Sequence, residues 1–363
     1  MNAPPPTVNE GGHFTKGRGG GCEGLTGASA LCKTYCVTSP ASDLAARDRR
    51  SSRSEVSLPP RNVTRCRKAI KEGAMACTAQ SVKLNSGTAM PLLGLGTFKM
   101  HGYEVVYGAL AAALEHGYRA VDTAAVYNNE ADVARALREL LPRHGLTRAD
   151  VFITSKLAPR DQGPGAAAAA LQSLENLDPG GYLDLYLVHW PGTQGLPGED
   201  PRNQELRRES WRLLEKLHGE GKLRAIGVSN YTVRHLEELL ATCSIKPSVL
   251  QVEYHPHLVQ KELLEYCQAH GIHMQAYSSL GMGHLLGEVT VQEVASRLGR
   301  TPAQVLLRWA LERGVGVIPK STGVERVASN AAVFDFKLTQ EDMEKLDGMD
   351  KQLHYCWNPN TIA

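Results

Sequence analysis

The chain has 363 residues, with 40 Lys and Arg against 38 Asp and Glu and a net charge of +2. That length allows one large domain or two ordinary ones, and the lack of any run of about eighteen apolar residues excludes a membrane-spanning helix on sequence grounds. Residues 1–74 hold 12 Lys and Arg against 6 Asp and Glu, so the remainder holds 28 against 32 and is mildly acidic, unlike a nucleic-acid binder.

Residues 1–78 differ from the rest in composition. The clusters PPP, GRGGGCEG and RRSSRS have neither helical nor strand periodicity. We therefore predict a disordered low-complexity extension over 1–78 and one globular domain over 79–363. Five of the eight cysteines lie within the first 77 residues, no CxxC pair occurs, and the cysteines are interpreted as reduced thiols of a cytoplasmic protein.

The Arg-rich stretch 47–68 leaves mitochondrial targeting as an alternative. Transit peptides usually begin near the amino terminus and avoid acids, whereas here the first residues are not basic and three acidic residues, Asp43, Asp48 and Glu55, lie before or within the stretch. Met75 could also be an alternative start, because the ordered-looking sequence begins soon after it. A disordered or non-native extension is the interpretation we favour.

From about residue 80 the chain alternates between strand-like and helix-like runs. SVKLNSGTAMP (81–91), with its Asn-Ser-Gly turn, predicts a short hairpin that could plug the bottom of a barrel. Eight strand-like runs follow, at 91–98, in the stretch 119–130, and at 151–157, 183–191, 223–230, 248–255, 273–280 and 315–321.

Helical patterns separate these strands. One apolar stripe consists of Val106, Leu110, Ala113 and Leu114, and a second of Val133, Leu137, Leu140 and Leu141. An Ala-rich run at 165–171 continues into a helix. Thr301 and Gln304, with Pro302 between them, predict a capped helix start.

Eight βα units over about 280 residues match a (β/α)₈ TIM barrel of the α/β class. A doubly wound sheet is the competing fold. Against it, the turn GLGTFKMHG (94–102) lacks the GxGxxG spacing, and the sequence has no βα turn of that type followed about twenty residues on by an acidic residue.

Four polar residues follow or end strand-like runs and form a candidate proton-donating site: Asp122, Tyr127, Lys156 and His189. Strand carboxyl ends form the active face of such barrels, and neighbouring strands stand about 5 Å apart, so these side chains can converge. An ammonium lowers a nearby tyrosine pKa, so Lys156 is expected to lower the pKa of Tyr127, with Asp122 holding Lys156 charged and His189 orienting a carbonyl.

Taken singly, each residue also has a structural explanation. Asp122 could cap a turn, Lys156 could be a rim charge, and His189 could be a hydrogen-bonded core histidine. The four together, with the basic stretch IPKS (318–321) later in the chain, suggest carbonyl reduction with a phosphorylated nicotinamide cofactor.

The sequence resembles the aldo-keto reductase family over about 80–363. The resemblance rests on GLGTFK (94–99), DTAAVYNNE (122–130), ITSKL (153–157), DLYLVHWP (184–191), IGVSNY (226–231), QVEYHP (251–256), AYSSLG (276–281) and IPKS (318–321). It implies that the family's catalytic tetrad falls on the four residues above. It also implies NADPH as the cofactor, bound without a Rossmann domain, in agreement with the missing glycine pattern.

The same resemblance implies the cofactor-binding residues. Ser229, Asn230 and Gln251 match the positions that hold the nicotinamide amide, and Tyr277 matches the residue that stacks on the ring, although a core tyrosine is the structural alternative. The remaining implied positions are Thr97 and Asp122, Ser278, Leu280 and Gly281 over the pyrophosphate, Lys320, Ser321, Thr322 and Arg326 at the 2′-phosphate, and Asn330 at the adenine. Ser329 departs from the pattern, because the family often has Glu there.

The substrate side departs further from many relatives. Phe98 stands where many mammalian members have Trp, and Ala158 stands where they have a large aromatic residue, which would widen the pocket or leave another loop to fill it. We predict substrate contacts from Phe98, Tyr127, His189, Trp190 and Trp357, with a surface or packing role as the alternative for Trp357. The short loop 191–205 and short tail resemble compact-loop members such as diketogluconate, glyoxal and prostaglandin-F-type reductases.

The predicted function is NADPH-dependent reduction of aldehydes and ketones to alcohols, by a monomer without nucleic-acid, membrane or metal partners. One alternative is a non-catalytic NADPH-binding barrel that acts as a redox-sensing or structural subunit. A metal-dependent hydrolase using Glu253, His255 and His257 is a third possibility. It is disfavoured because these three cluster at a single strand end, whereas such sites draw ligands from several strand ends.

Overall fold

The computed structural model describes residues 80–177 and 180–363. Within them, eight parallel strands form one sheet in chain order. The first and last strands also meet: the Gly94 amide donates to the Val317 carbonyl at 2.9 Å, and the Val317 amide donates to the Leu92 carbonyl at 2.7 Å. The sheet is thereby closed, and the predicted (β/α)₈ barrel is confirmed.

The barrel strands occupy the predicted runs. They are β3 (Leu95–Gly96), β4 (Ala120–Asp122), β5 (Phe152–Leu157), β6 (Leu185–Val188), β7 (Ile226–Ser229), β8 (Val249–Glu253), β9 (His273–Tyr277) and β10 (Gly316–Val317). All six residues of β5 and all five of β8 are buried, as expected for parallel strands covered on both faces.

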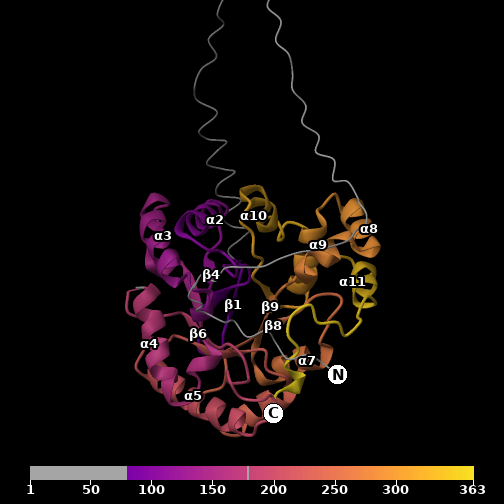
Figure 1. Cartoon of the computed structure of the whole chain (residues 1–363). Coiled ribbons are helices and arrows are strands. Elements are labelled where there is room, and N and C mark those ends of the chain that lie inside the picture. The colour runs from indigo at the N-terminus through magenta and orange to yellow at the C-terminus, as the bar shows by residue number, and fades with distance from the viewer. Residues whose placement is uncertain (1–79, 178–179) are drawn as a thin grey trace, which may run out of the picture. The chain divides into compact units, whose positions relative to one another are not determined.

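The helices follow one another around the strands, as the colour order of Figure 1 shows. They are α2 (Tyr103–Glu115), α3 (Glu130–Arg143), α4 (Ala166–Leu177), α5 (Arg202–Gly219), α6 (Val233–Leu240), α7 (Lys261–His270), α8 (Val289–Leu298), α9 (Pro302–Glu312), α10 (Val324–Ala331) and α11 (Gln340–Asp347). Short 3-10 turns lie between some of them: η1 (Ala125–Tyr127), η2 (Arg148–Asp150), η3 (Pro159–Asp161), η4 (Gly163–Gly165), η5 (Gly281–Gly287) and η6 (Pro359–Thr361).

Two sequence signals for helices are confirmed in detail. The predicted apolar stripes of α2 and α3 are buried in the main core, which lies between the strands and the helices. Helix α9 begins at the predicted capping box. The Thr301 side chain accepts from the Gln304 amide at 3.2 Å, and the Gln304 side chain accepts from the Thr301 amide at 2.9 Å. These bonds satisfy amides that the first turn leaves without partners.

The hairpin before the barrel closes its amino-terminal end. Strands β1 (Ser81–Lys83) and β2 (Ala89–Pro91) pair antiparallel around the predicted turn. Met90 and Leu84 are buried in a second core cluster together with residues of β4, β5, β6 and β8. The Asn85 side chain donates to the Pro247 carbonyl at 2.9 Å and fixes the turn to the barrel. The predicted plug is therefore present at this end of the barrel.

Some predictions fall outside the part of the chain that the structure describes. The extension 1–78 and the boundary between it and the globular domain are among them, and both stay predictions. Within 80–177 and 180–363, no helix is long and apolar enough to cross a membrane.

Candidate active site

The four predicted catalytic residues come from three successive strands at the carboxyl end of the barrel. Asp122 is the last residue of β4, Lys156 lies near the end of β5, and His189 directly follows β6. Tyr127 ends η1, the turn that follows β4. Strands β4, β5 and β6 are hydrogen-bonded neighbours, so the barrel brings the four residues together as predicted.

A buried ion pair forms the base of this site. The Lys156 ammonium donates to the Asp122 carboxylate at 2.5 Å and to the Thr123 carbonyl at 2.8 Å. The second carboxylate oxygen of Asp122 accepts from Gln251 at 2.8 Å. Lys156 is fully buried, and its burial lowers the pKa of the ammonium while the Asp122 carboxylate opposes that shift. Removal of either partner would leave an uncompensated buried charge.

Tyr127 and His189 lie above the ion pair. Their ring centroids are 5.7 Å apart with the rings edge to face, and the Lys156 ammonium lies 5.1 Å from the Tyr127 ring centroid. Burial, and then the charge of Lys156, lowers the pKa of His189 to about 3. The imidazole is therefore neutral at physiological pH and can donate one hydrogen bond to a carbonyl oxygen.

The expectation that Lys156 lowers the pKa of Tyr127 is wrong. Burial raises the pKa of the Tyr127 hydroxyl well above 10, and the negative charge of Asp122 raises it further. The physical reason is that the loss of hydration on burial outweighs any stabilisation of the phenolate by the Lys156 ammonium, which is paired with Asp122. Tyr127 therefore keeps its proton at neutral pH, in the form that a general acid requires.

A buried asparagine positions the loop that carries Tyr127. The Asn129 side chain accepts from the Thr123 hydroxyl at 2.6 Å and donates to the carbonyls of Thr97 and Met100 at 3.0 Å each. It thereby ties the loop after β3 to the loop after β4. The sequence did not predict this role. The only sequence feature that points to it is that Asn129 lies inside the DTAAVYNNE motif.

The same contact places Phe98 beside Tyr127. Their ring centroids are 5.1 Å apart, and Phe98 is 46% exposed, so it forms one outer wall of the site. The hydroxyl of Thr97, predicted to contact the cofactor, donates to the Asp122 carbonyl at 3.0 Å and fixes the backbone at the ion pair.

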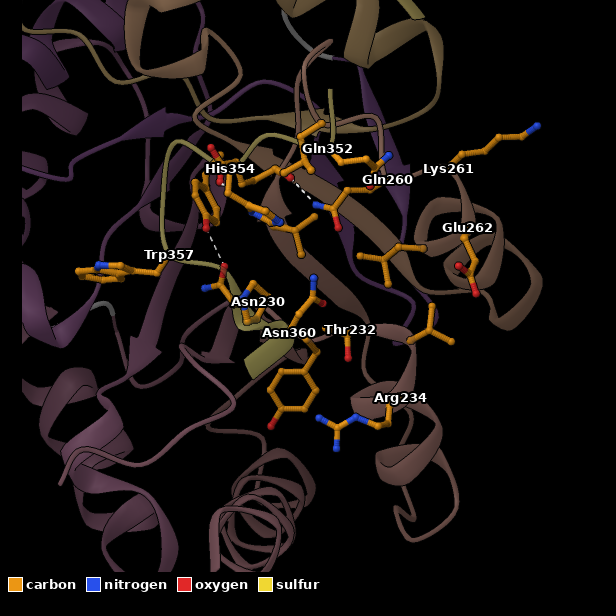
Figure 2. A pocket seen from close by; sticks show the side chains of 18 of the residues that line it. Asn230, Thr232, Arg234, Gln260, Lys261, Glu262, Gln352, His354, Trp357 and Asn360 are labelled. Atoms are coloured by element: carbon orange, nitrogen blue, oxygen red, sulfur yellow. Dashed lines mark hydrogen bonds and ion pairs between the residues drawn. The ribbon is translucent and has the colours of Figure 1, made fainter. Parts of the chain in front are cut away.

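The residues predicted to hold the nicotinamide amide lie at the adjacent ends of β7 and β8. The Asn230 side chain donates to the His189 carbonyl at 2.9 Å and accepts from the Tyr277 hydroxyl at 2.7 Å, which is the dashed line at Asn230 in Figure 2. It also donates to the Ser229 hydroxyl at 3.1 Å. Gln251 donates to Gln275 at 2.8 Å as well as to Asp122. Gln251 thus joins the predicted cofactor residues to the ion pair, and the Asn230 backbone amide donates to the Gln251 carbonyl at 2.9 Å.

Unfavourable backbone conformations concentrate at this end of the barrel. Among the described residues, the non-glycine residues with positive φ are Lys99, Asn128, Asn230, Gln260, Ser278, Met282 and Gln352. All but Gln352 lie in connections that follow a barrel strand, and Gln352 lies in the carboxyl-terminal segment. Such conformations persist only where the surrounding structure enforces them, and they are common at ligand sites.

The loop predicted to cover the pyrophosphate begins at β9. Ser278 has φ 51°, Gly281 φ 55° and Met282 φ 55°, so the chain turns sharply over the barrel end. A side chain at Gly281 would stand 2.0 Å from Leu285, and the site therefore requires glycine. Leu280 is partly buried and packs against the core.

The predicted 2′-phosphate residues gather at the start of α10. Lys320, Thr322 and Arg326 are exposed, and Ser321 is buried. The Arg326 guanidinium donates to the Ser321 hydroxyl at 3.2 Å and lies over Gly323, where a Cβ would stand 2.8 Å from the guanidinium carbon. An uncovered cationic pair at a helix amino terminus is suited to an anion.

The residue predicted to contact the adenine, Asn330, lies on α10. Asn330 is buried on α10, and the carbonyl of Ser329 accepts from the Gln304 side chain at 2.8 Å. The backbone at the position where relatives often have Glu is thus held by α9.

The substrate side is open and aromatic. Trp190 and Trp357 meet edge to face with ring centroids 6.3 Å apart, and Trp357 is 76% exposed, so it extends the wall while remaining mostly in solvent. Ala158 is fully buried. The Gln194 amide donates to the Pro159 carbonyl at 3.2 Å, so the loop after β6 crosses the segment next to Ala158. Whether the pocket beside Ala158 is wider than in relatives or filled by another loop stays a prediction.

The three candidate metal ligands, Glu253, His255 and His257, are each hydrogen-bonded to another side chain. The buried Glu253 carboxylate contacts His255 Nε2 at 3.1 Å and His354 Nδ1 at 3.2 Å, while His257 contacts the Tyr355 hydroxyl at 2.8 Å. Within the part of the chain that the structure describes, no group of three or more His, Cys, Asp or Glu residues is arranged to hold a metal ion.

A cavity of about 500 Å³ adjoins the site. Asn230 and Tyr277 line it together with the carboxyl-terminal segment, whereas none of the four predicted catalytic residues does. In Figure 2, Gln352 and His354 lie on one side of the cavity and Thr232 and Arg234 on the other, while Trp357 points away from them.

Three neutral histidines, of which His235 is buried and His189 and His273 are partly buried, give a prediction for acid stability. Burial lowers the pKa of His235 to about 4 and of His273 to about 4, as it does for His189, from an unfolded value of 6.5. Between pH 6.5 and 4.5 the unfolded chain thus binds protons that the folded chain does not. The free energy of unfolding should therefore fall as the pH falls, by up to about 1.4 kcal/mol per pH unit for each histidine.

Urea unfolding at several pH values across this window measures the slope. His273→Leu serves as the matched variant, because His273 Nε2 is buried without a hydrogen-bond partner and its loss breaks no bond. The slope should be smaller in that variant. An equal slope in both proteins, or stability that rises toward pH 4.5, would contradict the prediction.

Comparison with known proteins agrees with this geometry. A family model described as "Aldo/keto reductase family" matches residues 92–351. Glyoxal reductase of Bacillus subtilis (strain 168) is 45% identical over 283 residues, which cover 78% of this chain and 97% of that protein. The 9,11-endoperoxide prostaglandin H2 reductase of Trypanosoma cruzi is 38% identical over 291 residues, with coverage of 79% and 98%.

Solved structures give the same result. An aldo-keto reductase enzyme from a Medee basin deep-sea metagenome library superposes with a TM-score of 0.71 at 38% identity, covering 78% of this chain and all of that one (100%). Aldose reductase from Schistosoma japonicum gives a TM-score of 0.69 at 39% identity, with coverage of 76% and 93%. The chain therefore belongs to the aldo-keto reductase family of oxidoreductases, which act on carbonyl compounds.

Proposed function

We propose that this protein reduces aldehydes and ketones to alcohols with NADPH, and that Tyr127 is the general acid. The observation that carries the proposal is the buried Lys156–Asp122 ion pair lying beneath Tyr127, with the neutral His189 ring next to it. This combination supplies a proton donor, a hydrogen-bond donor and a fixed positive charge around one point.

The residues at α10 fit a phosphorylated cofactor. Lys320 and Arg326 offer two cations, and the absence of a side chain at Gly323 leaves room for the guanidinium beside Ser321. We infer that these residues hold the 2′-phosphate, that Ser229, Asn230 and Gln251 face the nicotinamide amide, and that Tyr277 faces the ring. When bound, reduced nicotinamide supplies the hydride that the carbonyl carbon receives.

The protein's own groups supply the proton and the orientation. His189 donates a hydrogen bond to the carbonyl oxygen and holds it near the Tyr127 hydroxyl. Tyr127 then transfers its proton to that oxygen as the carbonyl carbon gains the hydride, which gives the alcohol. Although the pKa of Tyr127 is high, the alkoxide that forms is a stronger base, so the transfer is downhill. Lys156 stabilises the tyrosinate until it regains a proton from solvent.

A panel of aldehydes and ketones, assayed separately with NADPH and NADH, tests the proposal. We expect NADPH oxidation with small reactive carbonyls such as methylglyoxal and with aromatic aldehydes such as nitrobenzaldehyde, and much weaker activity with NADH. Binding of NADPH without turnover across the panel would instead favour the non-catalytic barrel. The monomeric state and the cytoplasmic location stay predictions, and size-exclusion chromatography would test the first.

A further inference from the structure

The carboxyl-terminal segment His354–Trp357 is anchored by a buried carboxylate. Glu253, the last residue of β8, accepts from the Tyr355 amide at 2.9 Å, the Cys356 amide at 3.1 Å, and the side chains of His255 and His354. Burial alone would raise the pKa of Glu253, but the hydrogen bonds from His255, His354 and Tyr355 outweigh it and hold the pKa at about 2. The segment is thus bound to the barrel by a charged, fully hydrogen-bonded anchor.

This anchor places the Tyr355 ring between three imidazoles. The ring stacks on His284 with centroids 4.7 Å apart at 10°, and it lies 5.3 Å from His255 and 6.1 Å from His257. His257 Nδ1 is hydrogen-bonded to the Tyr355 hydroxyl at 2.8 Å, and His257 Nε2 lies 3.1 Å from the Lys351 ammonium and 3.3 Å from the Glu288 carboxylate. Tyr355 is therefore fixed by both its ring and its hydroxyl.

One of these contacts reaches the loop over the predicted pyrophosphate site. His284 belongs to η5, which forms that loop, and a Cβ built on Gly281 would stand 3.0 Å from the Tyr355 ring. The Tyr355 ring thus lies directly against the loop backbone. Leu285 holds one side of the loop in the core, but the tip of the loop has few such contacts, because Met282 and His284 are exposed and the backbone at Met282 and Gly283 is left-handed. Packing from outside the loop must hold this tip in place.

We infer that Tyr355 is a positioning residue for the cofactor, because it joins the loop over the pyrophosphate to the Glu253 anchor and so controls how readily that loop opens. The inference rests on the proposed function, since it takes the loop at 278–287 to cover a nicotinamide cofactor. Loss of the ring removes the contact at the loop tip, while Leu285 still packs in the core. The tetrad is unaffected, because neither Tyr355 nor His284 contacts Tyr127, Lys156 or His189 among the contacts of the described residues.

The test measures release of NADPH by stopped-flow fluorescence and its Kd by titration. Tyr355→Ala should release NADPH roughly tenfold faster and raise its Kd by a similar factor, which is the upper range for loss of an aromatic pair. Tyr355→Phe keeps the stack and loses only the bond to His257, so its release rate should stay close to that of the wild type. His284→Ala should resemble Tyr355→Ala, and His284→Phe should resemble the wild type.

The controls separate this inference from the proposed function. If the wild-type protein binds no NADPH, the proposed function fails and the inference fails with it. If the wild type binds NADPH but Tyr355→Ala and His284→Ala release it at the wild-type rate, the inference alone is overturned. His284 is exposed, so its variants should fold even if Tyr355→Ala does not. The double variant should release NADPH no faster than Tyr355→Ala, because both changes remove the same contact.

Discussion

Replacement of Tyr127 by phenylalanine should lower kcat for carbonyl reduction by roughly 10²–10⁴-fold, the range that a general acid contributes. The change removes the hydroxyl that would protonate the carbonyl oxygen. It keeps the ring that packs against Phe98 and His189, so the site should retain its shape. Steady-state kinetics with an aldehyde substrate, together with fluorescence titration of NADPH, measure the two effects separately. The Kd for NADPH should stay close to the wild-type value.

Tyr186→Phe is the matched control for this variant. Tyr186 is a fully buried residue of β6, and its hydroxyl is 3.5 Å from the Ser173 hydroxyl, outside the site. The control also removes one buried phenol hydroxyl from the barrel, and we expect kcat to change little. Normal turnover by Tyr127→Phe would rule out Tyr127 as the proton donor. A large loss in both variants would show that the effect is one of folding.

The second large effect is expected at the proposed phosphate site. Arg326→Ala should raise the Kd for NADPH by roughly 10- to 100-fold, because hydrogen bonds to charged groups contribute about 1.5–3 kcal/mol each. NADH lacks the 2′-phosphate, so its Kd should not change. The preference of the protein for NADPH over NADH should therefore decrease. Lys320→Ala should act in the same direction. Competition titrations at fixed ionic strength measure both constants, since salt screens such contacts.

Lys345→Ala is the matched control, because it removes one positive charge from an exposed side chain of α11 that pairs with Glu341. Its effect on NADPH should be negligible. An equal loss of NADH and NADPH affinity in Arg326→Ala would contradict a specific role in phosphate binding. A wild-type preference for NADH would contradict the proposed cofactor itself.

The features that sequence predicted well depend on local pattern. The eight apolar runs, the capping box at Thr301 and the Asn-Ser-Gly hairpin each follow from residues close together in the chain, and all are present. Asp122, Lys156 and His189 could be placed because the polarity of parallel strands sends their ends to one face. Their convergence follows from strand order alone.

What sequence did not predict depends on side chains that are far apart in the chain. The raised pKa of Tyr127 reflects burial first and then the negative charge of Asp122, and a motif does not encode how deeply a side chain is buried. Glu253 and Tyr355 are 102 positions apart, and their contact becomes evident only when the carboxyl-terminal segment is folded against the barrel. The exposure of Trp357 likewise depends on how the carboxyl-terminal segment packs beyond Tyr355.

Because the positive-φ residues lie at one end of the barrel, substitutions can raise thermal stability more at that end than at the other. The end closed by the hairpin consists of relaxed backbone, whereas the opposite rim holds Asn230, Ser278 and other residues in conformations that each cost about 1–3 kcal/mol. A search for more heat-resistant variants would therefore find its largest gains at this rim, for example by Ser278→Gly. The same substitutions would loosen the loops that hold the reactants. Thermal stability and catalytic rate thus depend on the same few residues, and selection for one would be expected to reduce the other.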